Sequence, residues 1–509
     1  MIRFVTLFLS LLACLLSGVL SGCDTASQAP LTTANNAVPP FQKSEYRPGG
    51  DTTVSIKPFA SFELPVANLP DNQKALFHAG KALANQPWVK APTITTARDG
   101  LGPIYNARTC LMCHINGGKG FMPDNPDQAL SGTLVRLSKP ASDTRPIDPT
   151  LGVVAHPVYG DQLQTQSISL AHQLRFSQPN LNHDVPPEAY IFVRWQAHPY
   201  QYPDGNRVEL RTPKLEFNYL GYGPLGDDTL MGLRVAPTIH GMGLIELIPQ
   251  AAIDALADPE DADGNGISGR INLVWDAESQ SEKPGRFGLK ANKASLAHTV
   301  AGAFTNDVGI TNALVPNQPC TALQSQCLNS PNGNDDNGLD AQGKTKPLVE
   351  LPDDLLKLVV DFNRNIAPVA RRNVNSKKVK QGRTLFYQVG CHQCHQPSYI
   401  TADSEEFPHL ANQTIWPYTD LLLHDLGPEL ADNRPDFLAS GSEWRTPPLW
   451  GIGMSKAVNG SSALLHDGRA RTVEEAILWH GGEAQSIKLA FTALAATQRE
   501  ALLKFVESL

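Results

Sequence analysis

Two short motifs are the clearest chemical feature of this sequence. Each has the pattern C-x-x-C-H, in which two cysteines lie three positions apart and a histidine follows directly. Two thiols at this spacing lie on one side of a helical turn and can bond to the two vinyl groups of a haem, while the histidine binds the iron. The motifs therefore predict two covalently attached c-type haems, whose attachment residues are Cys110, Cys113 and His114 in the first motif and Cys391, Cys394 and His395 in the second.

The N-terminus is typical of an exported protein. Arg3 precedes an almost wholly apolar stretch over residues 4–20, which ends in small residues. This pattern predicts a signal peptide over residues 1–22 and not a bilayer anchor. The four residues that end at Cys23 resemble a bacterial lipobox, which predicts that Cys23 is acylated; plain secretory cleavage is the alternative.

The segment after Cys23 has the composition of a flexible tether. Residues 23–58 are rich in Ser, Thr, Ala, Asn and Pro. Asp24 resembles a retention signal for the inner membrane, although that rule varies between bacteria. We therefore expect a periplasmic protein that is lipid-anchored in the inner or the outer membrane.

The four cysteines outside the two motifs can also be assigned. Cys14 lies in the signal peptide and Cys23 in the lipobox. Cys320 and Cys327 remain, and in the oxidising periplasm we expect them to form a local disulfide. No free C-x-x-C dithiol is left, so thiol–disulfide exchange by the protein's own cysteines is not expected.

Composition and charge exclude several classes of protein. The chain has 509 residues, which suits two or three domains, and 41% of them are apolar, so it can form packed cores. It carries 42 basic and 50 acidic residues, a net charge of −8. Nucleic-acid binding is disfavoured, because it normally needs a surplus of basic residues.

The elements around the motifs indicate two haem domains. A helix is expected from Asp71 to about Ala84 before the first motif, and alternating segments predict a β-rich insertion over residues 130–235. Further helices are expected before the second motif and after Thr472, where a capping box occurs. We predict a mainly α fold with two cytochrome c-like haem domains, the first over residues 59–347 with the β-rich insertion and the second over residues 348–509.

The chain resembles the bacterial di-haem oxidoreductase family, whose members are also called "putative peroxidase" and "thiol oxidoreductase". The resemblance covers nearly all of residues 70–509, and it rests on stretches such as RDGLGPIYNARTCLMCH, RVAPTIHGMGLIELIP, DADGNGISGR, GRFGLKA, EWRTPPLWG and LLHDGRARTVEEAILWHGGEA. The second half is more distantly similar to di-haem cytochrome c peroxidases and to the methylamine-utilisation di-haem enzymes. This resemblance implies one electron-transfer haem and one haem at which peroxide or another oxidant reacts.

The resemblance also indicates the second ligand of the C-terminal iron. In the related peroxidases this ligand follows an H-x-G turn by 14 positions, and here the turn at His466 leads to His480. Those enzymes usually have Met there, so a His predicts a lower reduction potential. The alternatives are His424, His466 and Met454, and the first two could instead bond to a haem propionate.

The first iron has no such obvious second ligand. The related peroxidases place a distal His soon after the first motif, but the next His here is His156. Either the first iron is open or its ligand comes from afar, and the candidates are His156, His240, His298, Met122 and Met242. For an open iron, we expect Glu246, a carboxyl in an apolar run, to handle peroxide's protons, with Arg234 and Gln164 in the same pocket.

One loop has the spacing of a calcium site. Asp261, Asp263 and Asn265 follow the 1, 3, 5 pattern of oxygen ligands, and Ile267 can offer its carbonyl. Position 12 is Asn272 and not the usual Glu, so a capped polar turn is the alternative to bound Ca²⁺.

Together these features predict a periplasmic di-haem c oxidoreductase of the peroxidase type. Electrons would pass from the C-terminal haem to the N-terminal haem, where peroxide or a similar small oxidant is reduced. The donor would be a small periplasmic electron-donor protein or a quinol-linked cytochrome. Three alternatives stay open: a pure electron-transfer cytochrome, an oxidase acting on a protein or metal substrate, and an assembly partner in periplasmic iron handling.

Overall fold

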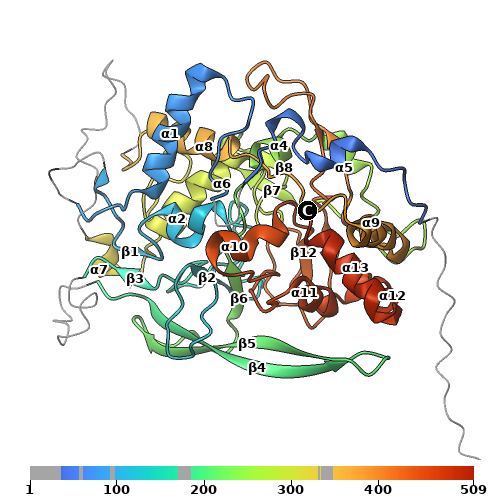
Figure 1. Ribbon diagram of the computed structural model, residues 1–509. Helices are drawn as coiled ribbons and strands as arrows, with labels where there is room; N and C mark the ends of the chain where they lie inside the picture. The colour runs from blue at the N-terminus through green and yellow to red at the C-terminus, as the bar shows by residue number, and fades with distance from the viewer. Residues whose placement is uncertain are drawn as a thin grey trace, which may run out of the picture. The chain divides into compact units, whose positions relative to one another are not determined.

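Figure 1 shows the computed structural model, coloured along the chain. The structure describes residues 36–56, 61–91, 94, 98–169, 185–330, 333 and 348–509. The chain is 28% helical and 19% strand, and its described strands form six separate two-stranded sheets. The prediction of a mainly α fold is therefore wrong. The 40 Gly and 40 Pro residues interrupt the chain, so long irregular stretches and short hairpins occupy much of it.

One group of helices carries the first motif. It consists of α1 (Asp71–Asn85), α2 (Cys110–Cys113), α4 (Met242–Glu246), α6 (Leu296–Ala303), the π-helix η5 (Phe304–Val308) and α8 (Asp353–Arg364). Helix α1 lies against α8 because Gly80 allows a close approach: a Cβ at Gly80 would lie 2.0 Å from the carbonyl oxygen of Leu358. Phe77, Phe304 and Phe362 fill the core between these helices.

A second group of helices carries the second motif (Figure 1). It consists of α9 (Lys377–Val389), η6 (Cys391–Gln393), α11 (Val473–Trp479), α12 (Gln485–Ala493) and α13 (Ala496–Val506). Gly382 of α9 faces the carbonyl of Ala501 in α13, where a Cβ would lie 1.9 Å from the oxygen. Phe386, Tyr418 and Phe505 fill the core of this group.

The sheets are antiparallel pairs, and three of them matter for the site. Strand β2 (Thr133–Ser138) pairs with β6 (Leu230–Val235), and β11 (Leu423–Asp425) pairs with β12 (Glu443–Arg445). The long hairpin of β4 (Ala189–Gln201) and β5 (Arg207–Leu220) lies along the bottom of the view in Figure 1. The other strands are β1 (Ile104–Tyr105), β3 (Gln166–Ser167), β7 (Leu273–Asp276), β8 (Ser281–Pro284), β9 (Tyr399–Ile400) and β10 (Thr414–Ile415).

Residues 36–56 are folded, whereas the sequence predicted a flexible tether over residues 23–58. They form η1 (Lys43–Tyr46) and η2 (Gly50–Thr52), and Glu45 is fully buried. The Glu45 carboxylate pairs with Arg371 at 3.1 Å and with Arg383 at 2.7 Å, so this segment is attached to the C-terminal half. The predicted signal peptide and Cys23 lie outside the described residues.

The two halves of the chain share their packing. Helix α8 follows the predicted boundary at residue 347 but packs against α1, α4 and α6 of the first half. The remaining helices are η4 (Ile115–Gly117), α5 (Gln250–Asp254), α7 (Ser325–Leu328), η7 (Ile452–Met454), α10 (Ser455–Asn459) and η8 (Gly482–Ala484). The boundary itself stays a prediction. Within the described ranges, no helix has the length and apolar character needed to cross a membrane.

Candidate functional site

The first motif forms a short helix whose histidine is oriented by a backbone carbonyl. Thr109 caps α2, since its Oγ1 accepts a hydrogen bond from the Met112 amide at 3.1 Å. His114 Nδ1 donates to the carbonyl of Pro237 at 2.7 Å, which leaves Nε2 with its lone pair free for iron. Burial lowers the pKa of His114, so the imidazole is held in the neutral form that binds metals.

The second motif is built in the same way. Helix α9 ends at Gly390, whose φ of 102° lets the chain turn directly into the cysteines. His395 Nδ1 donates to the carbonyl of Tyr418 at 3.0 Å, so its Nε2 is also free. Burial and then the neighbouring His480 lower the pKa of His395 to about 4. The two imidazoles are therefore near enough to interact.

His480 has the geometry of a second iron ligand. It ends α11, and its Nδ1 donates to the carbonyl of Ala476 at 2.7 Å. Burial lowers the pKa of His480, so it too is neutral with a free Nε2. His395 and His480 thus each have Nδ1 bonded to a backbone carbonyl and a lowered pKa, which is the state in which a histidine can bind iron.

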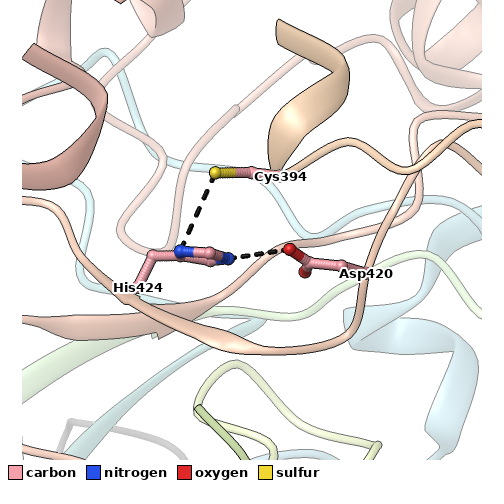
Figure 2. A group of neighbouring side chains, drawn as sticks. All are labelled: Cys394, Asp420 and His424. Atoms are coloured by element: carbon pink, nitrogen blue, oxygen red, sulfur yellow. Dashed lines mark hydrogen bonds and ion pairs between the residues drawn. The ribbon is translucent and has the colours of Figure 1, made fainter. Parts of the chain in front are cut away.

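The competing ligands for this iron are placed differently. His466 stacks on Trp444 with ring centroids 3.7 Å apart, and Met454 packs with Phe62 in another cluster. Figure 2 shows that His424 lies between Cys394 and Asp420, with Nδ1 3.7 Å from the sulfur and Nε2 2.8 Å from the carboxylate.

His424 is engaged at both ring nitrogens. Its Nδ1 also contacts Glu483 at 2.7 Å, so both ring nitrogens face carboxylates. Burial alone would lower the pKa of His424, but its neighbours Cys394 and Asp420 raise it well above its usual value. Although Cys394, Asp420 and His424 lie close enough to hold an ion, Cys394 belongs to the haem motif. The trio therefore forms part of the wall around the second motif.

A carboxyl that sequence reasoning missed lies beside the first motif: the Asp307 backbone carbonyl accepts from the amides of Asn106 and Ala107, a few residues before Cys110. Asp307 lies on the π-helix η5, a form of helix that often marks functional sites. It interacts electrostatically with the thiols of Cys110 and Cys113. Burial raises the pKa of Asp307. No motif spacing links it to His114, so the sequence carried no signal for it.

Two glutamines bond to the segment that carries Asp307. Gln162 Nε2 donates to Asp307 Oδ1 at 2.9 Å and to the carbonyl of Asn306 at 2.8 Å. Gln164, a predicted pocket residue, donates to the same Asn306 carbonyl at 2.9 Å and accepts from Asn106 at 2.8 Å. Gln164 therefore lies one hydrogen-bonded step from Asp307 and supports it.

The other two predicted catalytic residues are engaged in ion pairs. Glu246 pairs with Arg364 at 2.8 Å and accepts from the amide of Leu296 at 3.0 Å, so its carboxylate holds α4 against α8 and α6. Arg234 pairs with Asp432. No described contact joins Glu246 to His114.

The candidate distal ligands of the first iron have other partners. His156 uses both ring nitrogens, on the Leu225 carbonyl and on backbone amides, and His298 uses both as well, on the Lys293 amine and the Ala277 amide. His240 Nε2 donates to the Trp450 carbonyl at 3.1 Å, whereas its buried Nδ1 has no hydrogen-bond partner among the described residues. The methionines, Met122 and Met242, pack within hydrophobic clusters.

The calcium-type loop brings its carboxylates together and adds one. Asp258 joins Asp261 and Asp263 in a group whose oxygen atoms lie within 4.8 Å of one another. Asn265 donates to Asp263 and accepts from the amide of Ile267. Asn272, at position 12, is buried and bonds elsewhere, to the carbonyls of Lys290 and Asp436. Bound Ca²⁺ stays a prediction.

The two remaining cysteines are joined. Cys320 and Cys327 form a disulfide with Cα atoms 5.7 Å apart, as the sequence predicted. Next to it, Gln324 bonds to the buried Glu188, whose other oxygen accepts from the Gln164 amide at 2.7 Å. The disulfide thereby lies beside a chain of hydrogen bonds that leads to Gln164.

Comparisons with known proteins identify the family. The model of the family described as "Di-haem oxidoreductase, putative peroxidase" matches residues 43–509, and the chain belongs to this family. No curated protein sequence matches the chain significantly. Among solved structures, Kuenenia stuttgartiensis hydrazine synthase, pressurized with 20 bar xenon, is 18% identical; the match covers 32% of this chain and 57% of that chain with a TM-score of 0.21, and so carries no argument.

Proposed function

We propose that this di-haem oxidoreductase reduces peroxide at the iron bound by His114, using electrons that arrive through the haem held by His395 and His480. The observation that carries the proposal is the asymmetry between the two motifs. The imidazole of His480 interacts with that of His395, whereas among the described residues only burial and the Pro237 carbonyl affect the pKa of His114. The second motif thus has a further histidine beside its own, and the first has the Asp307 carboxyl near its cysteines, which supports two ligands for one iron and a reactive position at the other.

The residues present fit two haems attached as c-type groups. Each motif offers two thiols that have no disulfide partner and one neutral histidine held at Nδ1. Bound haem supplies the site for the oxidant and the storage of electrons. The protein's own residues orient the ligands, exclude bulk water and move protons.

A chain of aromatic contacts supports electron flow between the motifs. His424 lies beside Cys394 and opposite Trp444 in the β11–β12 ladder. Trp444 stacks on His466 with centroids 3.7 Å apart. The carbonyl of His466 accepts from β6, the strand that leads to the turn holding His114. These contacts lead from the second motif to the strand that precedes Pro237, whose carbonyl orients His114.

Asp307 is the residue suited to handle protons at the first haem. Reduction of one peroxide to two waters consumes two electrons and two protons, and the O–O bond breaks as the leaving oxygen takes a proton. A carboxyl with a raised pKa can deliver that proton and recover another from water. Gln162 fixes its orientation through the bond to Oδ1.

The location and partners belong to the same proposal. The leader and the lipobox at Cys23 support a lipid-anchored periplasmic protein. A small electron-donor protein or a quinol-linked cytochrome would supply the electrons, and peroxide or a similar small oxidant would receive them. Membrane fractionation of the full chain, with and without Cys23→Ser, tests the anchor; soluble wild-type protein would refute it.

Electron paramagnetic resonance of the haem-loaded protein tests the central claim. We expect one low-spin ferric signal from the bis-histidine haem and one signal from an open iron that peroxide removes. Two low-spin signals that peroxide leaves unchanged, in both the oxidised and half-reduced protein, would contradict the proposal and identify an electron-transfer cytochrome.

A further inference from the structure

A buried cluster of charges beside the first motif has more positive than negative members. The cations are Arg136, Arg234, Lys290, Lys293 and Arg434, and the carboxylates are Asp161, Asp432 and Asp436. These groups interact with one another electrostatically, so they form one cluster, which we call the cationic cluster. Five positive charges face three negative ones, which leaves a surplus of two.

Two of the cations are neutralised by a carboxylate of their own. Arg136 contacts Asp161 at 2.6 Å, and Arg434 contacts Asp436 at 3.1 Å. The guanidinium of Arg434 is 1% exposed and also donates to a strand carbonyl. These two pairs use Asp161 and Asp436. The surplus positive charge therefore lies on Arg234, Lys290 and Lys293.

Arg234 and Lys290 share the third acid. Both contact Asp432, Lys290 at 3.5 Å, and the two cations are 7% and 1% exposed. The Nη2 atom of Arg234 is buried and has no hydrogen-bond partner. Both cations also lie over the ring of Trp444, with Arg234 4.5 Å and Lys290 4.3 Å from its centroid. An aromatic face attracts cations but cannot balance a full charge.

Lys293 has no carboxylate partner among the residues that the structure describes. Its amine contacts Nε2 of His298 at 3.0 Å, and Asp276, which also acts on it, is paired with Lys283. Burial lowers the pKa of both Lys290 and Lys293 to about 8. Unpaired buried charge costs several kcal/mol per ion, so the fold needs further anions at this place.

The cationic cluster lies beside the first motif. Arg136 interacts with Asp307, which interacts with Cys110 and Cys113. Arg234 lies three residues before Pro237, the residue whose carbonyl orients His114. If Asp307 is ionised, the surplus falls from two to one, so at least one buried anion is still required. A haem brings two carboxylates, on the edge opposite the vinyl groups that the cysteines bond.

We propose that the cationic cluster is the binding site for the propionate carboxylates of the haem held by His114, with Arg234, Lys290 and Lys293 as their partners. Arg234 is therefore a cofactor-binding residue and not a catalytic one. The free Nη2 of Arg234 supplies a hydrogen bond, and a guanidinium fork suits a carboxylate. The inference rests on the di-haem assignment and not on the reaction with peroxide.

The test uses the haem-loaded full chain and the reduction potential of each haem. Lys290→Gln removes a positive charge beside the propionates, so the ferric state gains stability and the potential of the N-terminal haem falls. Asp432→Asn removes a negative charge from the same cluster, so that potential rises. We expect each variant to change the ratio of reduced to oxidised N-terminal haem about tenfold, which is ~59 mV for one electron.

Matched controls separate charge from misfolding. The C-terminal haem in the same molecule should keep its potential in both variants. Lys283→Gln removes a lysine whose side chain is 51% exposed. This variant should keep the ratio of reduced to oxidised N-terminal haem within twofold of the wild-type ratio. Resonance Raman spectra of the ferric protein should show a shifted propionate bending band in Lys290→Gln and an unshifted one in Lys283→Gln.

Two results would overturn the proposal. One is that Lys290→Gln and Asp432→Asn both change the ratio less than threefold, or both in the same direction. The other is that the propionate band stays unshifted in Lys290→Gln while acetate, added to the wild type, changes the N-terminal potential, which would assign the site to a free anion. Neither result depends on peroxide, so this inference and the proposed reaction can fail separately.

Discussion

Replacing Asp307 by Asn is the sharpest test of how the protein handles protons. Asparagine keeps the size of the side chain and an oxygen that can still accept from Gln162, a bond of 2.9 Å in the wild type. It removes only the exchangeable carboxyl proton. Because burial raises the pKa of Asp307, an uncharged replacement also avoids the cost of a buried carboxylate, so the variant should fold at least as well as the wild type.

The expected loss of rate follows from the role of the carboxyl. A positioned general acid or base contributes about 10²–10⁴-fold, and Asp307 is the carboxyl that interacts with the cysteines of the first motif. Each factor of ten corresponds to about 1.4 kcal/mol of barrier, so Asp307→Asn should raise the barrier by roughly 3–5 kcal/mol. The protonated form exists below its raised pKa, so the wild-type rate should fall as pH rises through that value. The rate of the Asp307→Asn variant should not fall in this way as the pH rises.

Stopped-flow measurement of peroxide consumption, with a reduced C-terminal haem, checks both expectations. Glu246→Gln is the matched control, because Glu246 is a carboxyl of the same half that pairs with Arg364 at 2.8 Å. It should lose stability and keep its rate within about twofold. If Asp307→Asn reacts within threefold of the wild type and keeps the same pH profile, while its haem spectra are unchanged, the reasoning about this carboxyl is wrong.

Three further predictions concern His480, Glu45 and Cys327. His480→Met should raise the potential of the C-terminal haem, because Met ligation favours the reduced iron; an unchanged potential in a redox titration would show that His480 is not a ligand. Glu45→Ala leaves two arginines buried without their carboxylate, so denaturant titration should show a loss of roughly 3–5 kcal/mol, and a loss below ~1 kcal/mol would contradict the buried ion pair. Cys327→Ser opens a short loop and should cost about 2.5 kcal/mol by chain entropy; equal stability of wild type and variant under oxidising conditions would refute a role for the bond to Cys320.

The sequence was sufficient to predict the features that depend on the spacing of nearby residues. The C-x-x-C-H motifs, the disulfide between Cys320 and Cys327 and the cap at Thr472 depend on residues only a few positions apart, and the structure shows the disulfide and the cap directly. His480 was found through the spacing of a resembling family, and the structure places it near His395. Such features need no knowledge of the fold, because chain geometry alone brings their members together.

The fold class was not determined by these local patterns. Amphipathic helices near the motifs suggested a mainly α protein, but the long irregular connections and the hairpins, such as β4 with β5, make up much of the chain. Hairpin pairing and irregular packing depend on partners in the tertiary structure, which single-sequence periodicity does not show. Residues 43–56 likewise read as a polar tether, yet two arginines from the C-terminal half bury Glu45.

The tertiary structure alone decided which charged groups belong to the site. Glu246 sat in an apolar run and so suggested an active carboxyl, but Arg364 neutralises it. Asp307 sat in an unremarkable stretch, and only the packing of η5 against the first motif brings it near the cysteines. The sequence by itself determined which residues can attach haem, because the C-x-x-C-H motif is a local pattern. Only the fold determined what surrounds each motif, because burial and charge balance are sums over residues that are distant in the chain.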